Sequence, residues 1–465
     1  ARHTWTAAQM FKWDPGNSLY LEASRHGFEF LRDRMWDEEY GGFFTMTGRR
    51  GIPVENEQAG MTKTAYGNAF AIYGLAAYFG VSRDSAALEL AQKAFRWLES
   101  NSHDPVYGGY FQFLERDGTP LTEGHRGTPP KDQNSSIHLM EAFTELYHVW
   151  KNELLRSRIE EMLVLIRDTI TTDRGYMNLF FRRDWTPVYY TDEAYPGGDN
   201  RHLFDYISFG HDIETAFLLL EASEALGREE DERTLEVSKR MTDHALNNGW
   251  DPETGALFDA GYYFSDKEHV TILDSATAWW SAVEAFHTML LMSSLYPNDP
   301  MEYFDRFALT WDYCKKYLID HEYGGWYRAG TNHEPGAAEG SKAGIWKGNY
   351  HTARSLIRCM KMLNLPDQDP EEPVNPDASP EARALLEYLH RISGDSILSG
   401  HQNYNRDLDR WHRYVEELTG ESPAVWGSDF SRYYEEGNPE ALVEEAVRRH
   451  KEGYVVTLMW HTGRP

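Results

Sequence analysis

The amino-acid sequence predicts a mainly α-helical protein in which helix pairs repeat along the chain, followed by a short β/α segment. Eleven segments before residue 364 carry apolar residues at the i, i+3, i+4 spacing of helices with one buried face. One turn signature recurs between successive pairs of these segments. After residue 380, strand-like and helical stretches alternate. Together these patterns indicate two regions of different architecture within 465 residues.

The repeated turn signature reads Asp or Glu, then Gly, then aromatic residues, which is turn chemistry that leads into a short β-segment. It is found as WDEEYGGFF at 36–44, DPVYGGYF at 104–111, DRGYMNLFF at 173–181, DPETGALFD at 251–259 and DHEYGGWY at 320–327. Helix pairs that repeat at this period either stack as an open solenoid or close into a toroid. The repeat alone leaves both architectures open.

The expected helices form five pairs and one unpaired helix at the end. They cover 1–13 and 17–35, 63–80 and 85–102, 135–150 and 152–170, 211–226 and 230–249, 275–296 and 301–319, and finally 344–363. A closed ring of six pairs requires twelve helices, so one partner is lacking. In a closed ring, a helix before Ala1 could supply it.

The first helix of each pair differs in composition from the second. The first helices contain polar and aromatic residues, whereas the second helices, such as LLRSRIEEMLVLIRDTI, are ordinary amphipathic ones. We therefore expect the first helices to form an inner ring whose ends face a central cleft. The second helices would form the outer wall.

The charge balance argues against polyanionic partners. The chain has 46 Lys and Arg against 74 Asp and Glu, a formal net charge of −28. Nucleic acids and anionic membranes require clustered positive charge, so neither is expected as a partner. No stretch approaches 18 uninterrupted apolar residues, so no membrane span is predicted. Cys314 and Cys359 are too few for a disulfide framework.

Other reaction classes lack their motifs. The sequence contains no His-Glu-x-x-His or CxxC metal motif, no GxxxxGK phosphate loop and no GxSxG elbow. Aromatic residues make up 14% of the chain, which suits either a sugar-binding cleft or a large aromatic core. The reaction classes that depend on those motifs are therefore not favoured by the sequence.

Three histidines lie at comparable places near the starts of expected inner helices: His138, His211 and His351. Glu214 follows His211 by three residues, so both lie on one helix face, and a carboxylate that orients a histidine produces a general base. Glu214 is equally compatible with a first-turn acid that the helix dipole favours. Glu141 follows His138 at the same spacing, and a structural role for His138 also stays open.

Several other residues on these helices suit sugar binding. The ring of Trp280, with Glu284 one turn later, suits a sugar platform with a hydrogen-bonding carboxylate. Arg2 and Tyr66 lie near helix starts, where they would bind hydroxyl groups or a developing negative charge. Core packing or surface roles remain the alternatives for these residues.

Taken in order, the motifs of residues 1–364 resemble the N-acylglucosamine 2-epimerase superfamily, most closely its cellobiose 2-epimerase branch. The motifs that carry the resemblance are ARHTWTAA, KTAYGNAFAIYGLAAYF, NSSIHLMEAFTELY, FGHDIETAFLLLEA, AWWSAVEA, YGGWY and WKGNYHTAR. The resemblance implies an (α/α)6 barrel, here without its first outer helix. It also implies epimerisation at C2 of a reducing-end sugar without cofactor or metal.

The resemblance also implies roles for individual residues. His211 and His351 match the histidines that exchange the C2 proton, His138 matches one assigned to ring opening or substrate binding, and Arg2 matches the arginine that stabilises the enediolate. Substrate-contacting or histidine-orienting positions are matched by Tyr66, Asn134, Glu214, Trp280, Glu284 and Trp346. This chain departs from relatives at Phe217, at Ala282 and in an insertion around 188–207.

The last part of the chain follows a Pro-rich and acid-rich linker, 365–380. Strand-like SILSGHQN at 396–403, PAVWGSDF at 423–430 and YVVTLMWHTG at 454–463 alternate with expected helices near 407–419 and 438–451. Residues 381–465 resemble the beginning of glycoside hydrolase family 26 mannanases. Trp460 and His461 match a cleft position there. We expect a partial (β/α)8 barrel with no mannanase activity, and both chain ends internal to a longer protein.

The expected function is C2 epimerisation of β-1,4-linked disaccharides by a monomer. The resemblance of residues 381–465 to mannanases favours mannobiose as the substrate. We expect cellobiose and lactose to be accepted as well. The alternatives are a mannose–fructose isomerase, an N-acylglucosamine 2-epimerase and a non-catalytic sugar-binding toroid. A cytoplasmic location fits the epimerase resemblance, whereas export fits the mannanase resemblance.

Overall fold

A computed structural model describes most of the chain as two compact units. It describes residues 1–55, 60–189, 205–228, 231–264, 268–363, 378–392, 398–403, 407–429 and 439–459. The first unit spans Ala1–Asn364 and the second Leu365–Pro465. No helix within the described ranges is long and apolar enough to cross a membrane.

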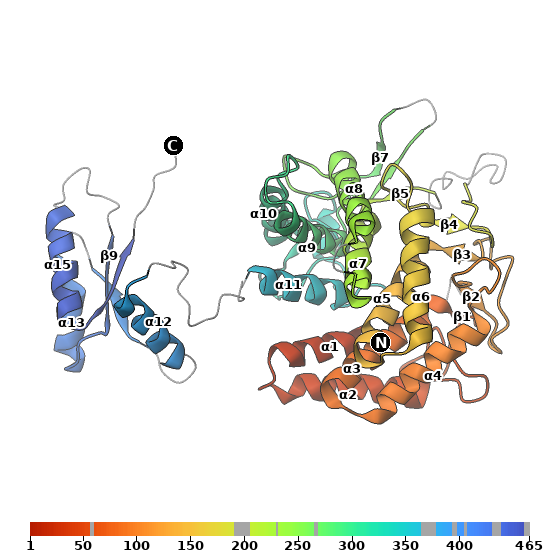
Figure 1. The fold of residues 1–465 in the computed structure, drawn as a ribbon, viewed down its shortest axis with the longest axis horizontal. Helices are drawn as coiled ribbons and strands as arrows, with labels where there is room; N and C mark the ends of the chain where they lie inside the picture. The colour runs from red at the N-terminus through yellow and green to blue at the C-terminus, as the bar shows by residue number, and fades with distance from the viewer. Residues whose placement is uncertain are drawn as a thin grey trace. The chain divides into compact units, whose positions relative to one another are not determined.

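Six helices form the inner ring of the first unit (Figure 1). They are α1 (Arg2–Trp13), α3 (Ala65–Ser82), α5 (Gln133–Val149), α7 (Phe209–Ala225), α9 (Trp279–Leu295) and α11 (Tyr350–Leu363). Each inner helix contacts the next one in chain order, and α11 contacts α1. The ring is therefore closed, and the open solenoid is excluded.

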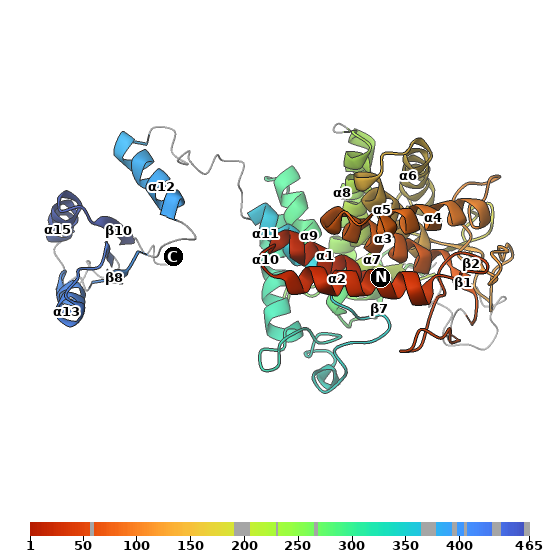
Figure 2. The same cartoon turned by 90° about the horizontal axis from the view of Figure 1, so that it is seen from below.

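Five outer helices pack against the inner helices that precede them in the chain. They are α2 (Ser18–Phe30), α4 (Ser85–Asn101), α6 (Glu153–Leu165), α8 (Glu232–Gly249) and α10 (Tyr303–Tyr313). Figure 2 shows the first such pair, α1 and α2, side by side. Three outer helices end in a π-helical turn, at Leu31–Met35, Ile166–Ile170 and Cys314–Leu318.

The inner helices α3, α5, α7 and α9 are buried on most sides because two ring neighbours and an outer helix cover each of them, whereas α1 and α11 are less buried. In α3, twelve of the residues between Ala65 and Tyr78 are buried, which leaves little amphipathic character. Much of the aromatic surplus packs in this core; Trp5, for example, stacks on Tyr73 with ring centroids 5.0 Å apart. The aromatic core that composition left open therefore accounts for much of that surplus.

Short antiparallel ladders precede three inner helices. β1 (Lys63–Thr64) pairs with β2 (Phe113–Leu114), β3 (Lys131–Asp132) with β4 (Phe180–Phe181), and β5 (Ile207–Ser208) with β6 (Ala260–Tyr262), which also pairs with β7 (Thr271–Asp274). The side chains of Thr64 and Asp132 cap α3 and α5. Figure 1 shows β1–β4 gathered at one edge of the helices.

Two expected helices begin later than predicted. The segment 275–296 becomes helical at Trp279, because β7 and a short extended stretch precede it. The segment 344–363 becomes helical at Tyr350, since the glycine-containing residues 344–348 form a loop. Trp346 is therefore in a loop before the inner helix and not within it.

The second unit contains a parallel sheet in the order β10-β9-β8. Its strands are β8 (Gly400–Gln402), β9 (Val425–Asp429) and β10 (Val455–Met459), and its helices are α12 (Pro380–Ile392), α13 (Arg410–Thr419) and α15 (Pro439–Lys451). Trp426 is fully buried in a small core. Most of the expected linker 365–380 lies outside the described residues, as do Trp460 and His461.

Candidate active site

The starts of the inner helices bring several predicted residues to one cavity of about 360 Å³. Its lining includes Arg2 from α1, Tyr66 from α3, Asn134 from α5 and Trp346 from the loop before α11. Phe70 contributes to its apolar wall. Four predicted site residues that are distant in sequence are thus neighbours around one cavity.

Aromatic rings connect this cavity to the first histidine. The ring of Tyr66 meets the imidazole of His138 edge-on, with centroids 5.3 Å apart, and lies 6.1 Å from the ring of Trp346. The Arg2 guanidinium lies 5.1 Å from the centre of the Phe70 ring. The walls therefore combine flat apolar faces with a fixed positive charge.

Trp280 lies close to both of the other two histidines. Its ring centroid is 4.6 Å from that of His211 and 5.6 Å from that of His351. The three side chains come from α7, α9 and α11, so ring closure is what brings them together. Two imidazoles therefore lie next to the same indole ring.

Each histidine has a hydrogen-bond partner at Nδ1. The partner of His138 is Glu141 at 2.9 Å, and that of His351 is Glu284 at 2.7 Å. A carboxylate only accepts hydrogen bonds, so these two contacts assign the proton to Nδ1 and leave Nε2 as the basic nitrogen. His211 differs, because its Nδ1 lies 2.8 Å from a hydroxyl, the Oγ of Ser208.

The expected pairing of Glu214 with His211 is wrong. Glu214 Oε1 accepts a hydrogen bond from Arg354 Nη2 at 2.5 Å and lies 3.8 Å from His351 Nδ1. The i+3 spacing places Glu214 one turn deeper in α7, where Arg354 projects from α11. Glu284 is fully buried and holds His351, so it is not the sugar-binding carboxylate suggested by its spacing from Trp280.

Arg354 is the functional candidate that sequence reasoning missed. Its guanidinium is fully buried and contacts Glu141 as well as Glu214, and its Nη2 donates to Glu284 Oε1 at 2.6 Å. The Tyr350 hydroxyl donates to Glu141 at 2.5 Å. The planar guanidinium thus joins the carboxylates that hold two of the histidines. Its position three residues after His351 was the available signal.

This arrangement also bears on metal binding. Donor atoms of Glu214, Glu284 and His351 all lie within 4.8 Å of one another, the one cluster of this kind among the described residues. Arg354 Nη2 contacts both of these carboxylates, so a guanidinium already stands where a cation would bind. The donor set therefore fits an ion-pair network better than a metal centre.

Burial lowers the pKa of the His211 and His351 imidazoles. Desolvation, with the charges of neighbouring basic groups, lowers the pKa of His211 to about 3. Desolvation also lowers the pKa of His351 to about 3, although the charge of Glu214 acts in the opposite direction. Burial raises the pKa of Tyr66 to about 12, so its phenol is neutral. Burial alone would raise the pKa of Glu141, but Arg354 and His138 hold it well below its usual range.

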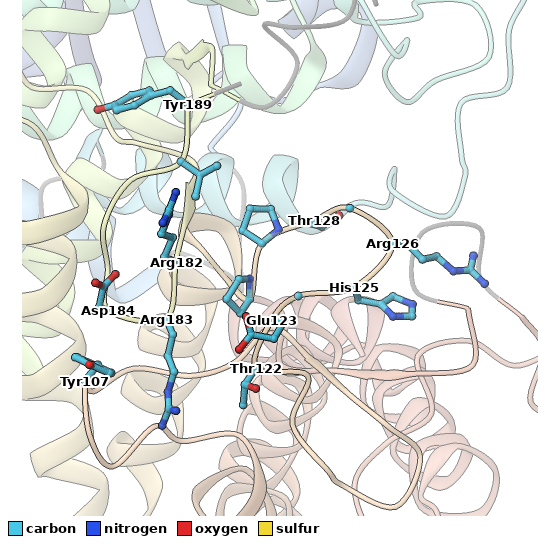
Figure 3. A pocket seen from close by; sticks show the side chains of 15 residues that line it. Tyr107, Thr122, Glu123, His125, Arg126, Thr128, Arg182, Arg183, Asp184 and Tyr189 are labelled. Atoms are coloured by element: carbon cyan, nitrogen blue, oxygen red, sulfur yellow. The ribbon is translucent and has the colours of Figure 1, made fainter. Parts of the chain in front are cut away.

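A second cavity of about 770 Å³ lies between residues 122–130 and 182–189, which adjoin β3 and β4 (Figure 3). Tyr107 and Arg183 are among its lining residues, and none of the predicted site residues is. Most of the insertion expected at 188–207 lies outside the described residues.

Comparison with known proteins identifies families for both parts of the chain. The N-acylglucosamine 2-epimerase (GlcNAc 2-epimerase) family model matches residues 1–355, and the glycosyl hydrolase family 26 model matches residues 374–465. A cellobiose 2-epimerase of Ruminococcus albus is 30% identical over 376 residues, which cover 78% of this chain and 86% of that protein.

A solved structure resembles most of the chain, and a second relative resembles its last part. The structure of cellobiose 2-epimerase from Spirochaeta thermophila has a TM-score of 0.66 and 32% identity, covering 78% of this chain and 84% of that one. A mannan endo-1,4-beta-mannosidase of Thermothelomyces thermophilus is 37% identical over 95 residues, 20% of this chain and 19% of that protein. With its helical ring and a match over residues 1–355, the chain belongs to the N-acylglucosamine 2-epimerase family.

Proposed function

We propose that residues 1–364 catalyse epimerisation at C2 of the reducing-end sugar of β-1,4-linked disaccharides such as cellobiose and mannobiose. The observation that carries the proposal is the gathering of two imidazoles at one indole ring, since the ring centroids of His211 and His351 lie 4.6 Å and 5.6 Å from that of Trp280. An epimerase that inverts one carbon requires a proton donor and acceptor on each face of that carbon. Relatives named cellobiose 2-epimerases support the disaccharide assignment.

The reaction begins with opening of the sugar ring, for which His138 is the candidate acid–base group. The resulting C1 aldehyde acidifies the C2–H bond. One imidazole accepts the C2 proton, and its electron pair forms a cis-enediolate with the charge on the oxygens. After rotation about C2–C3, the other imidazole donates a proton to the opposite face. The carbonyl supplies the acidity, so no redox cofactor is required.

The two histidines suit different halves of this exchange. The imidazole that donates must carry an extra proton. Burial favours the neutral form of both imidazoles, but Glu284 and Glu214 beside His351 act in the opposite direction, so we assign the donor role to His351. His211, whose Nδ1 partner is a hydroxyl, suits the neutral acceptor. Arg2 at the cavity supplies fixed positive charge toward the developing enediolate oxygens.

The cavity beside the histidines suits a second sugar unit. Tyr66, Phe70 and Trp346 give it flat apolar faces, and Asn134 adds a polar side chain. Pyranose rings stack on such faces through their C–H groups. The match of residues 374–465 to family 26 favours mannobiose as the natural substrate.

The proposal extends to the arrangement of the chain. Residues 1–364 would be the epimerase domain, 365–380 a linker, and 381–465 a partial barrel. Three parallel strands do not close a barrel, so we infer no hydrolase activity from residues 381–465 themselves. We propose that the chain acts as a monomer.

A product analysis tests the proposal against its alternatives. The full chain is incubated in heavy water with mannobiose, cellobiose, mannose or N-acetylglucosamine, and products are identified by NMR. We expect the C2 epimer of a disaccharide, with deuterium at C2. A ketose product would indicate an aldose–ketose isomerase, and activity on monosaccharides alone would refute the disaccharide assignment. Binding without any exchange would indicate a non-catalytic toroid.

A further inference from the structure

The repeated turn signature binds a buried lysine in two of its copies. Lys63 Nζ lies 3.0 Å from Asp37 Oδ2, and Lys131 Nζ lies 3.1 Å from Asp104 Oδ2. Neither lysine side chain is exposed to solvent. A lysine is very rarely buried completely unless it is paired, so these two pairs call for an explanation.

The two copies have the same further contacts. Each lysine also donates to the carbonyl of the first glycine of its signature, which is Gly108, at 2.8 Å, for Lys131. Each aspartate accepts from the Nε of an arginine 79 residues later, at 3.0 Å in the case of Arg183. In the second copy the Trp185 ring lies 4.7 Å from the lysine Nζ. Figure 3 shows the Arg183 guanidinium pointing away from that of Arg182.

The position of the lysines connects these clusters to the candidate active site. Lys63 is in β1, one residue before the Thr64 cap of α3 and three residues before Tyr66. In the second copy, Lys131 is in β3, directly before the Asp132 cap of α5 and three residues before Asn134. Each cluster therefore joins the turn of one repeat to the start of the next inner helix, where site residues begin.

We propose that Asp37–Lys63–Arg116 and Asp104–Lys131–Arg183, here called the lysine clamps, are positioning elements for the active site. They fix the first turns of α3 and α5, and with them Tyr66, Asn134 and His138, relative to the cleft. The role in catalysis rests on the proposed function. A displacement of about 1 Å in such groups reduces a rate roughly 100-fold, which is why the anchoring matters.

The second clamp is used for the test, in which a double substitution removes the buried positive charge of Lys131 and the buried negative charge of Asp104 together. Lys131→Met alone leaves Asp104 buried with the partly exposed Arg183 as its remaining ion-pair partner, so folding is weakened. Adding Asp104→Asn removes the buried negative charge, and we expect this double variant to recover most of the lost thermal stability. The Nζ contacts to the turn remain absent, so kcat for disaccharide epimerisation should stay at least about tenfold below wild type.

Lys239→Met is the matched control. Its Nζ lies 2.7 Å from Asp243 and 3.1 Å from Asp299 on the outer wall, so it is a doubly paired, partly exposed lysine that does not join a turn to the start of an inner helix. This variant should lose stability with unchanged kcat and KM. A double variant with wild-type kinetic constants would overturn the positioning role.

Amide hydrogen exchange provides a readout that does not depend on activity. Peptides that cover residues 131–139 should exchange faster in the double variant than in wild type, and at the wild-type rate in Lys239→Met. If the wild-type chain does not epimerise any sugar, the proposed function fails, and this exchange alone decides whether the clamp holds the start of α5. Unchanged exchange in the double variant would refute the clamp itself.

Discussion

The two sides of the cleft hold their histidines in different ways. His351 has carboxylates beside Nδ1, Glu284 at 2.7 Å and Glu214 at 3.8 Å, whereas the Nδ1 of His211 meets the hydroxyl of Ser208. A carboxylate stabilises an imidazolium, and a hydroxyl does so only weakly. Burial favours the neutral form of both imidazoles, but we propose that the carboxylates beside His351 make it the better holder of the extra proton that a donor needs, whereas His211 begins as the neutral base.

Removal of either imidazole should have the largest effect. We expect His211→Ala and His351→Ala each to reduce epimerisation roughly 10³-fold, because inversion requires a group on each face. If the two histidines serve opposite faces, the one that remains still exchanges the C2 proton of one epimer. NMR in heavy water, starting from each epimer in turn, measures both the rate of epimerisation and the rate of exchange of the C2 proton.

The exposed His26 on α2 provides the control, since His26→Ala should leave both quantities unchanged. Exchange that survives in the same epimer for both cleft variants would contradict the two-face arrangement.

Removal of the Arg354 guanidinium should disturb together the carboxylates that hold His138 and His351. Arg354→Met leaves Glu141, Glu214 and Glu284 buried without their common cation, and breaking a buried ion pair typically costs about 3–5 kcal/mol. Denaturant titration measures this loss of unfolding free energy. Arg358→Met, one turn later on α11, removes a partly exposed pair with Glu221 and should cost under about 1 kcal/mol. Equal costs for the two variants would contradict the network.

Removing the Nδ1 partner of one histidine at a time should show which histidine depends more strongly on its partner. Glu284→Gln keeps the shape but places an amide against His351, and we expect a loss of roughly 10²-fold in kcat. Ser208→Ala removes a neutral hydrogen bond of about 1 kcal/mol from His211, which corresponds to about a fivefold loss. Steady-state kinetics on one disaccharide gives both values. A larger loss in Ser208→Ala would reverse the assigned roles.

The sequence predicted contacts within a helix better than contacts between helices. The i+3 neighbour of His138 is its partner in the structure, because both residues belong to α5. The partner of His351 is 67 residues away, on α9. That contact depends on how the ring closes and on the rotation of each helix, neither of which follows from the spacing of residues along one helix.

The same limit explains why Glu214 was assigned to the wrong histidine. A shared helix face was visible in the sequence, but Arg354, which attracts Glu214, comes from α11. The helices themselves could be located from apolar periodicity. Two helices begin later than the periodicity predicts, because a short strand precedes Trp279 and a glycine-containing loop precedes Tyr350. Trp346 lies in that loop.

The smallest expected effect is a difference in the pH dependence of stability. Burial lowers the pKa of His211 to about 3 in the folded chain, whereas an unfolded histidine titrates near 6.5. The unfolded state therefore binds more protons between these values, and unfolding free energy is fully present above pH 6.5 and falls as pH decreases. His211→Gln removes this contribution, so its stability should decline less steeply than that of wild type between pH 6.5 and 4.

His351 should contribute in the same direction through its own lowered pKa, whereas Glu141, whose pKa is depressed, adds a loss of stability only below about pH 4.3. Because His211 is partly exposed, water screens its contribution, and the change in slope should be modest. Urea titrations at a series of pH values measure it, with His26→Gln as the control. If the slopes of wild type and His211→Gln are the same between pH 6.5 and 4, the imidazole of His211 is not held neutral by burial, and the division of labour between the two sides loses its electrostatic basis.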